Sequence, residues 1–349
     1  MTLSVCMIVK DEEEVLGRCL MSIQGIWDEL IVVDTGSKDN TKEIAGAFGA
    51  TVYDFAWCDH FAKARNFSFS KAREELVMWL DADDVLTEED CKKVQTLKSV
   101  MRDYDMAFAE YDAGGCRYVR ERIFRRECGF VWQGAVHEVI VPRGRIYHSD
   151  LTITHKKGKK GDSMRNLSIF QKQIASGEKL DERERFYYGR ELSYHNMETE
   201  AIAVLKEFLR GDGWGENKAE ACLVLFRLYQ KRGEEAEAKE CLVRSFLYAK
   251  PKAEVCCLLG DCFLQSNLSL AIDWYLRALD LDSADELRRG GFVQEDYLEF
   301  IPCMQLCYAY DRLGEYALAE RYNERAGRCK PQDERYLYNK RYFESRSRG

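Results

Sequence analysis

The sequence predicts two domains of different class. Residues 1–162 are expected to form an α/β domain with a mostly parallel sheet, and residues 163–349 an all-α helical-repeat domain. In the first half, short apolar runs typical of strands alternate with segments of helical spacing. The second half carries small residues at a repeated helical interval. A chain of 349 residues is also long for one domain and comfortable for two.

The strands and helices of the first half follow one another in a regular order. Short apolar runs predict strands at 3–9, 29–34, 50–53, 76–80, 105–109 and 151–155. Helices are expected at 12–21, in a segment that ends at Ala47, and at 63–73. An order of strand, helix, strand, helix predicts a mostly parallel sheet with right-handed connections.

Two carboxylates follow the apolar run 76–80. Asp81 and Asp83 come directly after a strand that reads as buried on both faces. Open α/β sheets bind ligands at the carboxyl ends of their strands, so both residues are candidates for holding Mg²⁺ or Mn²⁺ together with substrate phosphates. The alternative is an acidic turn that caps a helix starting near Thr87.

Asp34 ends the second strand, where a carboxylate can accept a hydrogen bond from a nucleobase imide or a ribose hydroxyl.

Composition and missing motifs exclude several functions. The absence of G-x-G-x-x-G after the first strand counts against dinucleotide binding, and the absence of G-x-x-x-x-G-K-[ST] excludes a P-loop ATPase. A net charge of −8 argues against a nucleic-acid partner.

The sequence also favours a cytoplasmic location. The N-terminal apolar stretch is too short for a signal peptide and lacks a basic leader. No stretch approaches the ~18 apolar residues that a membrane span needs. The 14 cysteines are scattered without a paired C-x-x-C frame, so free buried thiols in a reducing cytoplasm are expected.

Four segments in order carry a resemblance to a known family. They are MIVKDEE at 7–13, IVVDTGS at 31–37 with DNT at 39–41, FAKARN at 61–66 and LDAD at 80–83. Together they resemble the family 2 glycosyltransferases, whose GT-A fold is a Rossmann-like mixed sheet, and within them the branch of the sublancin S-glycosyltransferase. That branch commonly has Asn where this chain has Asp11, a change that adds charge near the nucleotide.

The resemblance implies a binding site for a UDP-sugar. The backbone around Val9 and the side chains of Glu12 and Asp34 would hold the uridine. Arg65 would reach the base or the ribose from its helix; the alternative is an exposed helical arginine.

The resemblance also implies a metal site. Asp81 would meet the ribose or the metal, and Ala82 lies beside it in the nucleotide-binding segment. Asp83 would ligate a Mn²⁺ or Mg²⁺ ion that bridges the diphosphate. His155 ends a short strand and resembles the late histidine that often completes this site, although a lone histidine is usually structural.

One further segment resembles an element that the related enzymes carry on the acceptor side of the cleft. The segment 134–138 ends in an adjacent His137 and Glu138, which in a strand would point to opposite faces. Inverting transfer needs a base for the acceptor proton, and we expect Glu138 in that role, with His137 as its partner or as a phosphate contact. The alternative is a surface glutamate.

Two basic segments leave alternatives open. The alternating run 117–126 is either an edge strand blunted by charge or a source of arginines near phosphates. The basic loop 156–161 either closes over the diphosphate or is a solvated linker.

The second half resembles tetratricopeptide repeats. Small or apolar markers are followed by an alanine thirteen residues on, or twelve in the third copy: Tyr188-Gly189 and Ala201, Leu225 and Ala238, Leu259-Gly260 and Ala271, Leu306 and Ala319. Stacked helix pairs bury a continuous core, and their concave groove suits an extended peptide or a homodimer contact.

These expectations combine into one functional prediction. The chain is expected to be an inverting, metal-dependent glycosyltransferase that moves a sugar from a UDP-sugar to a Ser/Thr or Cys side chain of a peptide or protein. One alternative is a saccharide or lipid-linked glycan acceptor, with the repeats serving oligomerisation. Another is a non-catalytic nucleotide-binding scaffold.

Overall fold

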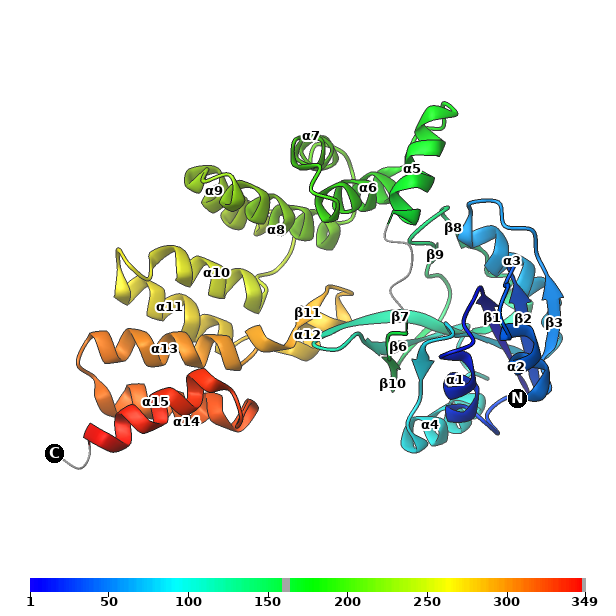
Figure 1. Cartoon of the computed structure of the whole chain (residues 1–349), viewed down its shortest axis with the longest axis horizontal. Helices are drawn as coiled ribbons and strands as arrows, with labels where there is room; N and C mark the ends of the chain where they lie inside the picture. Colours follow the sequence, from blue (N-terminus) through cyan, green and yellow to red (C-terminus); the bar gives the residue numbers. More distant parts are fainter. Residues whose placement is uncertain (159–163, 347–349) are drawn as a thin grey trace. The chain divides into compact units, whose positions relative to one another are not determined.

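The computed structural model describes residues 1–158 and 164–346. The chain forms two compact units, Met1–Met197 and Glu198–Gly349 (Figure 1). Residues 159–161 of the expected basic loop lie outside the described residues.

Unit 1, Met1–Met197, is built on a mixed sheet with the strand order β3-β2-β1-β4-β7-β6-β10-β5. The pairs β1–β2, β1–β4 and β2–β3 are parallel, whereas β7 is antiparallel to both β4 and β6. The strands are β1 (Leu3–Val9), β2 (Glu29–Asp34), β3 (Thr51–Asp54), β4 (Leu76–Trp79), β5 (Asp84–Val85), β6 (Met106–Asp112), β7 (Cys116–Arg125) and β10 (Ile146–His155). Strands β8 (Trp132–Gln133) and β9 (Val139–Ile140) form a two-stranded sheet of their own.

Helices cover both faces of the parallel half of this sheet. In β1, Val5 and Met7 pack with α1, α2 and α4, while Cys6 points to the other face and packs with residues from α3. Alternate side chains of a strand point to opposite faces, so a strand covered on both faces reads as an unbroken apolar run. The helices of unit 1 are α1 (Leu16–Ser22), α2 (Thr41–Ala47), α3 (Phe61–Lys71), α4 (Glu88–Val100), α5 (Arg165–Ala175) and α6 (Glu182–Tyr194), with a short 3₁₀ turn, η1 (Arg126–Cys128).

The segment 134–138 differs from the prediction. It is a bend between β8 and β9, and the strand expected there is wrong. Trp132 pairs with Ile140 in an antiparallel ladder, so the residues between the two strands must reverse the chain. Gly134 and His137 make that reversal at positive φ, 92° and 50°. His137 and Glu138 therefore do not alternate across a pleat.

The strand β7 also corrects an expectation. It lies between β4 and β6 in the sheet, so it is an interior strand and not an edge strand blunted by charge. Of its arginines, Arg122 is buried, whereas Arg117, Arg120 and Arg125 are half-buried.

Unit 2 is formed largely by helical hairpins. The expected markers Leu225 and Ala238, and likewise Leu306 and Ala319, are buried on the two helices of one hairpin each. The elements are α7 (Glu198–Phe208), α8 (Gly215–Lys231), α9 (Glu235–Ser245), α10 (Ala253–Phe263), α11 (Leu268–Leu279), α12 (Ser283–Arg288), β11 (Val293–Gln294), η2 (Glu295–Tyr297), α13 (Phe300–Arg312), α14 (Tyr316–Cys329) and α15 (Glu334–Arg346). The expected class, an α/β domain followed by helical repeats, is confirmed.

A glycine sets the close approach of two of these helices. Tyr275 of α11 is fully buried, and a Cβ built on Gly260 of α10 would lie 2.4 Å from its ring. The hydroxyl of Tyr275 donates a hydrogen bond to Asp261 at 2.6 Å, which holds the ring in place. The repeat marker at 260 is thus a packing requirement.

No helix among the described residues combines the length and apolar character that crossing a bilayer requires.

Candidate functional site

The candidate site lies where the parallel strands of unit 1 end. Strand β1 has β2 on one side and β4 on the other, so the order of connections reverses beside it. Ligands of open α/β sheets bind at the carboxyl ends of strands at such a switch point. The turn after β1 contacts the turn after β2, because Asp11 N donates to Ser37 Oγ at 2.9 Å and Glu12 N to Thr41 Oγ1 at 2.8 Å.

Asp34 shapes the turn after β2. It is buried, and its Oδ1 accepts hydrogen bonds from the backbone N–H groups of Gly36 and Ser37 at 2.9 and 3.0 Å. The carbonyl oxygen of Val9 accepts from both the N–H and the hydroxyl of Thr35, at 2.9 and 3.0 Å. These contacts join the ends of β1 and β2 where the uridine is expected.

Asp11 occupies a left-handed backbone conformation. Its φ is 54°, a region that Asn and Asp adopt more readily than other side chains. Its carboxylate accepts from Lys38 N at 2.7 Å. The replacement of the usual Asn by Asp therefore suits the local backbone while adding charge.

Three residues bring metal-ligand atoms together. Single ligand atoms of Asp83, Asp84 and His155 all lie within 4.8 Å of one another. The topology explains this: His155 ends β10 and pairs with Asp84 of β5, directly after Asp83. Asp83 Oδ1 lies 3.3 Å from His155 Nδ1.

The chemistry of this group fits a divalent cation. His155 Nδ1 is buried and has no aligned hydrogen-bond partner, although it is close enough to Asp83 for an ion pair. The Asp83 contact raises the pKa of His155 above its usual value, against the opposing effect of burial. One imidazole nitrogen and one carboxylate, both partly exposed, leave positions open for phosphate oxygens, as a divalent cation held together with phosphates requires.

Asp84 was missed by the sequence prediction, which named Asp81 instead. Asp84 is fully buried and contacts Arg122 Nη1 at 3.3 Å, and the Tyr111 hydroxyl donates to it at 2.8 Å. Burial raises the pKa of Asp84 to about 6 in spite of the Arg122 guanidinium. In the sequence, Asp84 could have been found as a candidate ligand because it is the third acid of the segment D-A-D-D at 81–84.

Asp81 faces a different partner. Its Oδ1 accepts from Arg65 Nη2 at 2.8 Å, and it does not belong to the group around His155. Burial acts to raise the pKa of Asp81, but Arg65 and Arg122 together hold it below its usual value. Its side chain remains 37% exposed, so it is within reach of a ligand.

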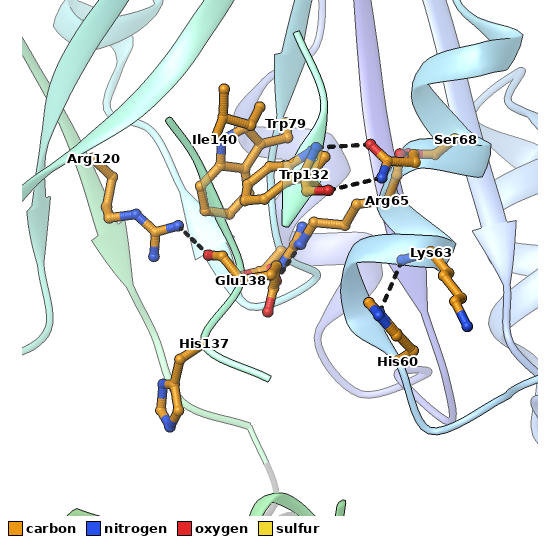
Figure 2. Close-up of polar contacts among 12 residues, drawn as sticks. His60, Lys63, Arg65, Ser68, Trp79, Arg120, Trp132, His137, Glu138 and Ile140 are labelled. Carbon is orange, nitrogen blue, oxygen red and sulfur yellow. Dashed lines mark hydrogen bonds and ion pairs between the residues drawn. The ribbon is translucent and has the colours of Figure 1, made fainter. Parts of the chain in front are cut away.

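Arg65 joins two carboxylates. Its Nε donates to Glu138 Oε1 at 2.5 Å (Figure 2). Its Nη2 donates to Asp81 Oδ1. The guanidinium carbon lies 4.5 Å from the ring centre of Trp79 and 5.0 Å from that of Trp132. Arg65 is buried, so the exposed helical arginine considered as an alternative is wrong.

Glu138 and His137 leave the bend in different directions (Figure 2). Glu138 is 8% exposed and bound to Arg65, which contradicts the surface glutamate considered as an alternative. His137 does not pair with Glu138: its Nε2 lies 2.8 Å from Glu191 Oε1, and its ring stacks on Tyr187 at 4.1 Å. Neither partner was anticipated, because both lie about fifty residues further along the chain.

Glu12 completes the acidic side of the site. Burial, together with the nearby carboxylates of Asp83 and Asp81, raises the pKa of Glu12 to about 7. Arg165, at the start of α5, opposes this effect. So many carboxylates in one place are stable when a cation shares them.

The arginines of β7 belong to the same network. Arg122 is buried with its guanidinium carbon 3.5 Å from the ring centre of Trp79, and Arg120 lies 5.2 Å from it. Arg120 also binds Glu121 through two contacts of 3.2 Å, and Trp79 Nε1 donates to the Glu121 carbonyl at 2.6 Å. Three guanidinium groups, those of Arg65, Arg120 and Arg122, thus pack against the Trp79 ring.

Comparison with known proteins identifies the first part of the chain. Residues 4–141 match the family model described as glycosyl transferase family 2. The resemblance to family 2 glycosyltransferases expected from the motifs is thereby confirmed for residues 4–141.

Several relatives share parts of the chain. A TPR repeat-containing protein of Synechococcus elongatus is 38% identical over 142 residues, which are 39% of this chain and 35% of that protein. The SPbeta prophage-derived glycosyltransferase SunS of Bacillus subtilis is 24% identical over 225 residues, 59% of this chain and 53% of that protein. An uncharacterised glycosyltransferase of Rickettsia typhi is 36% identical over 87 residues, 25% of this chain and 30% of that protein. The chain thus spans at most about half the length of these relatives.

Solved structures show weaker likenesses. TarS of S. aureus in complex with UDP-GlcNAc is 15% identical, with 96% of this chain and 93% of that chain covered and a TM-score of 0.39. Glucosyl-3-phosphoglycerate synthase from Mycobacterium tuberculosis with Mn²⁺ and UDP-Glc is 17% identical, with 52% and 80% covered and a TM-score of 0.37. Scores this low assign no ligand to this chain.

Proposed function

We propose that the protein is an inverting, metal-dependent glycosyltransferase that moves a sugar from a UDP-sugar to a Ser/Thr or Cys side chain of a peptide or protein. The observation that carries this proposal is the group of Asp83, Asp84 and His155 at the strand ends of a family 2 domain, beside Asp81. The group provides metal ligands, and Arg122 and Arg65 contact the neighbouring Asp84 and Asp81, a combination that suits a nucleotide diphosphate.

The donor would be held by the ends of three strands. In this proposal Glu12, Asp34 and the backbone of Val9 bind the uridine, as expected from the motifs. Arg65 holds Asp81 in a fixed orientation, and Asp81 with Ala82 meets the ribose. Preorganised contacts of this kind lower the cost of binding in the reactive geometry.

Asp83 and His155 would hold the divalent cation, with the buried Asp84 as support. When bound, the cation supplies Lewis-acid stabilisation of the charge that develops on the leaving diphosphate. The imidazole ligand favours Mn²⁺ over Mg²⁺, because Mg²⁺ prefers oxygen ligands alone.

Glu138 is proposed as the base. The acceptor O–H or S–H attacks the anomeric carbon, the bond from that carbon to UDP breaks, and Glu138 takes the proton. A thiol acceptor needs less help, since its ordinary pKa lies near ~8.5. The hydrogen bond from Arg65 holds the Glu138 carboxylate in a fixed position.

The acceptor is proposed to be a peptide or protein, and the match to the glycosyltransferase SunS supports this choice. The helical hairpins of unit 2 suit an extended peptide, with self-association as the alternative use of that surface. All 14 cysteines are free, which supports a reducing cytoplasm as the place of action.

The test is donor binding and turnover. UDP and a panel of UDP-sugars are added with and without Mn²⁺, and both thermal unfolding and UDP release are measured. A nucleotide at ~100 times its dissociation constant should stabilise the protein by ~2.7 kcal/mol. Stabilisation that requires Mn²⁺ supports the proposal. If no nucleotide shifts the unfolding temperature, the scaffold alternative replaces it.

A further inference from the structure

Unit 1 continues beyond residue 141, where the match to the family model ends. Helices α5 and α6 belong to this unit, and α6 contacts the bend 134–138 that carries Glu138. The bend is therefore held by α3, by α6 and by Arg120 of β7, whose Nη2 donates to the Glu138 carbonyl at 3.2 Å. Of these three, only α6 lies outside the matched residues 4–141.

The contacts from α3 fix the two ends of the bend. Phe61 N, at the start of α3, donates to the Ala135 carbonyl at 2.8 Å. Arg65 of the same helix binds the Glu138 carboxylate at 2.5 Å. These contacts leave His137, between them, with no hydrogen bond from α3.

The contacts from α6 hold His137. Its Nε2 lies 2.8 Å from Glu191 Oε1, and its ring stacks on Tyr187 with an interplanar angle of 13°. Arg183 Nε donates to the His137 carbonyl at 3.2 Å. Since His137 has a φ of 50°, a conformation that costs free energy for most side chains, these contacts stabilise a strained residue.

Glu191 is itself firmly held. It is 5% exposed, and Asn166 Nδ2 at the start of α5 donates to its Oε1 at 3.1 Å. Burial acts to raise the pKa of Glu191, but the bonds from His137 and Asn166 keep it below its usual value. A buried carboxylate with fixed partners is a rigid anchor.

We propose that Glu191 is a positioning residue for the transfer reaction. It holds His137, the peptide bond from His137 places Glu138, and Glu138 with Asp81 fixes the fork of Arg65. The inference rests on the proposed function, because it assumes that Glu138 acts as the base. It extends the catalytic unit to α6.

The decisive variant is Glu191→Gln, which keeps the size of the side chain and removes its charge. Turnover is measured as UDP release from the UDP-sugar that the parent uses, with water as acceptor. We expect kcat to fall about tenfold, as for a group whose loss misplaces a catalytic side chain. The KM and the dissociation constant of UDP with Mn²⁺ should change less than twofold, because the donor ligands are untouched. The control is Glu88→Gln, which removes an exposed ion pair on α4.

A second variant, at His137, keeps the inference testable if Glu191→Gln misfolds. His137→Asn keeps a side chain that tolerates positive φ and removes the ring. If Glu191 acts through His137, the double variant should lose no more turnover than either single variant. Additive losses, or a loss of UDP binding equal to the loss of kcat, would overturn the inference.

Hydrogen exchange tests, independently of turnover, whether Glu191 holds the bend 134–138. In Glu191→Gln, the amides of residues 134–138 should exchange faster than in the parent, while those of α3 are unchanged. Unchanged exchange in the bend overturns the inference even if activity falls. If the parent turns over no UDP-sugar, the proposed function fails, and faster exchange still supports the contact between Glu191 and the bend.

Discussion

Both units bury charged side chains, but in different surroundings. In unit 1, Asp81 is paired with buried Arg65 and yet remains 37% exposed, and Asp83 is 27% exposed. In unit 2, Lys252 lies 3.4 Å from Glu216, and their side chains are only 2% and 8% exposed. The first group can meet a ligand, whereas the second can act only on stability. A charged group with partly exposed members can therefore serve as a binding site, whereas a group whose members are all buried only balances its own charges.

The substitution Asp83→Ala should separate function from stability most sharply. It removes one of the two partly exposed side chains proposed to hold the metal, so Mn²⁺-dependent stabilisation by UDP should disappear and UDP release should fall at least about 100-fold. Isothermal titration with Mn²⁺ and UDP checks the binding. Asp103→Ala, at an exposed position, serves as control and should behave as the parent does. Retained Mn²⁺ dependence in Asp83→Ala would remove Asp83 from the metal site.

Arg65→Lys should lower both the stability of the protein and its turnover. Lysine keeps the charge but cannot reach Asp81 and Glu138 with one planar fork. Breaking such a buried pair costs about 3 kcal/mol of unfolding free energy. Urea unfolding and UDP release measure the two effects. Arg102→Lys, at an exposed position, is the control; a variant at 65 as stable as the parent would show that the fork is dispensable.

Gly260→Ala should change stability alone. The new Cβ would lie 2.4 Å from the buried ring of Tyr275, and overpacking of this kind costs about 2 kcal/mol. Nucleotide binding by unit 1 should be unchanged. The matched control is Gly46→Ala in α2, where the Cβ meets open space and helix propensity should add about 0.5–1 kcal/mol. Equal effects at the two glycines would contradict the packing argument.

Glu286→Gln should have the smallest effect, which should appear in the pH dependence of unfolding. Burial raises the pKa of Glu286 to about 7, above the ordinary value of 4.5. The folded state therefore binds this proton more tightly than the unfolded state, and stability falls as the pH rises from about 4.5 to 7. The variant should flatten that part of the pH dependence of unfolding, followed by circular dichroism. A profile identical to the parent's would show that Glu286 titrates normally.

Local pattern predicted much of the fold. The strands at 3–9 and 29–34 match β1 and β2, because strands buried on both faces leave a continuous apolar run in the sequence. The start of α1 at Leu16 instead of Glu12 was not predicted, since residues 12–15 form turns that also have helical spacing. The bend at 134–138 was missed because its conformation depends on the pairing of β8 with β9.

The sequence by itself located the buried strands and the acidic and histidine side chains at their ends. Asp83 and His155 were named from motifs, since acids after a buried strand and a histidine at a strand end are local features. Only the tertiary structure decided the partners: Asp84 joins that group, Asp81 turns to Arg65, and His137 binds Glu191. The physical reason is that side-chain partners are set by strand order and helix packing over separations of up to about seventy residues along the chain, which periodicity does not encode.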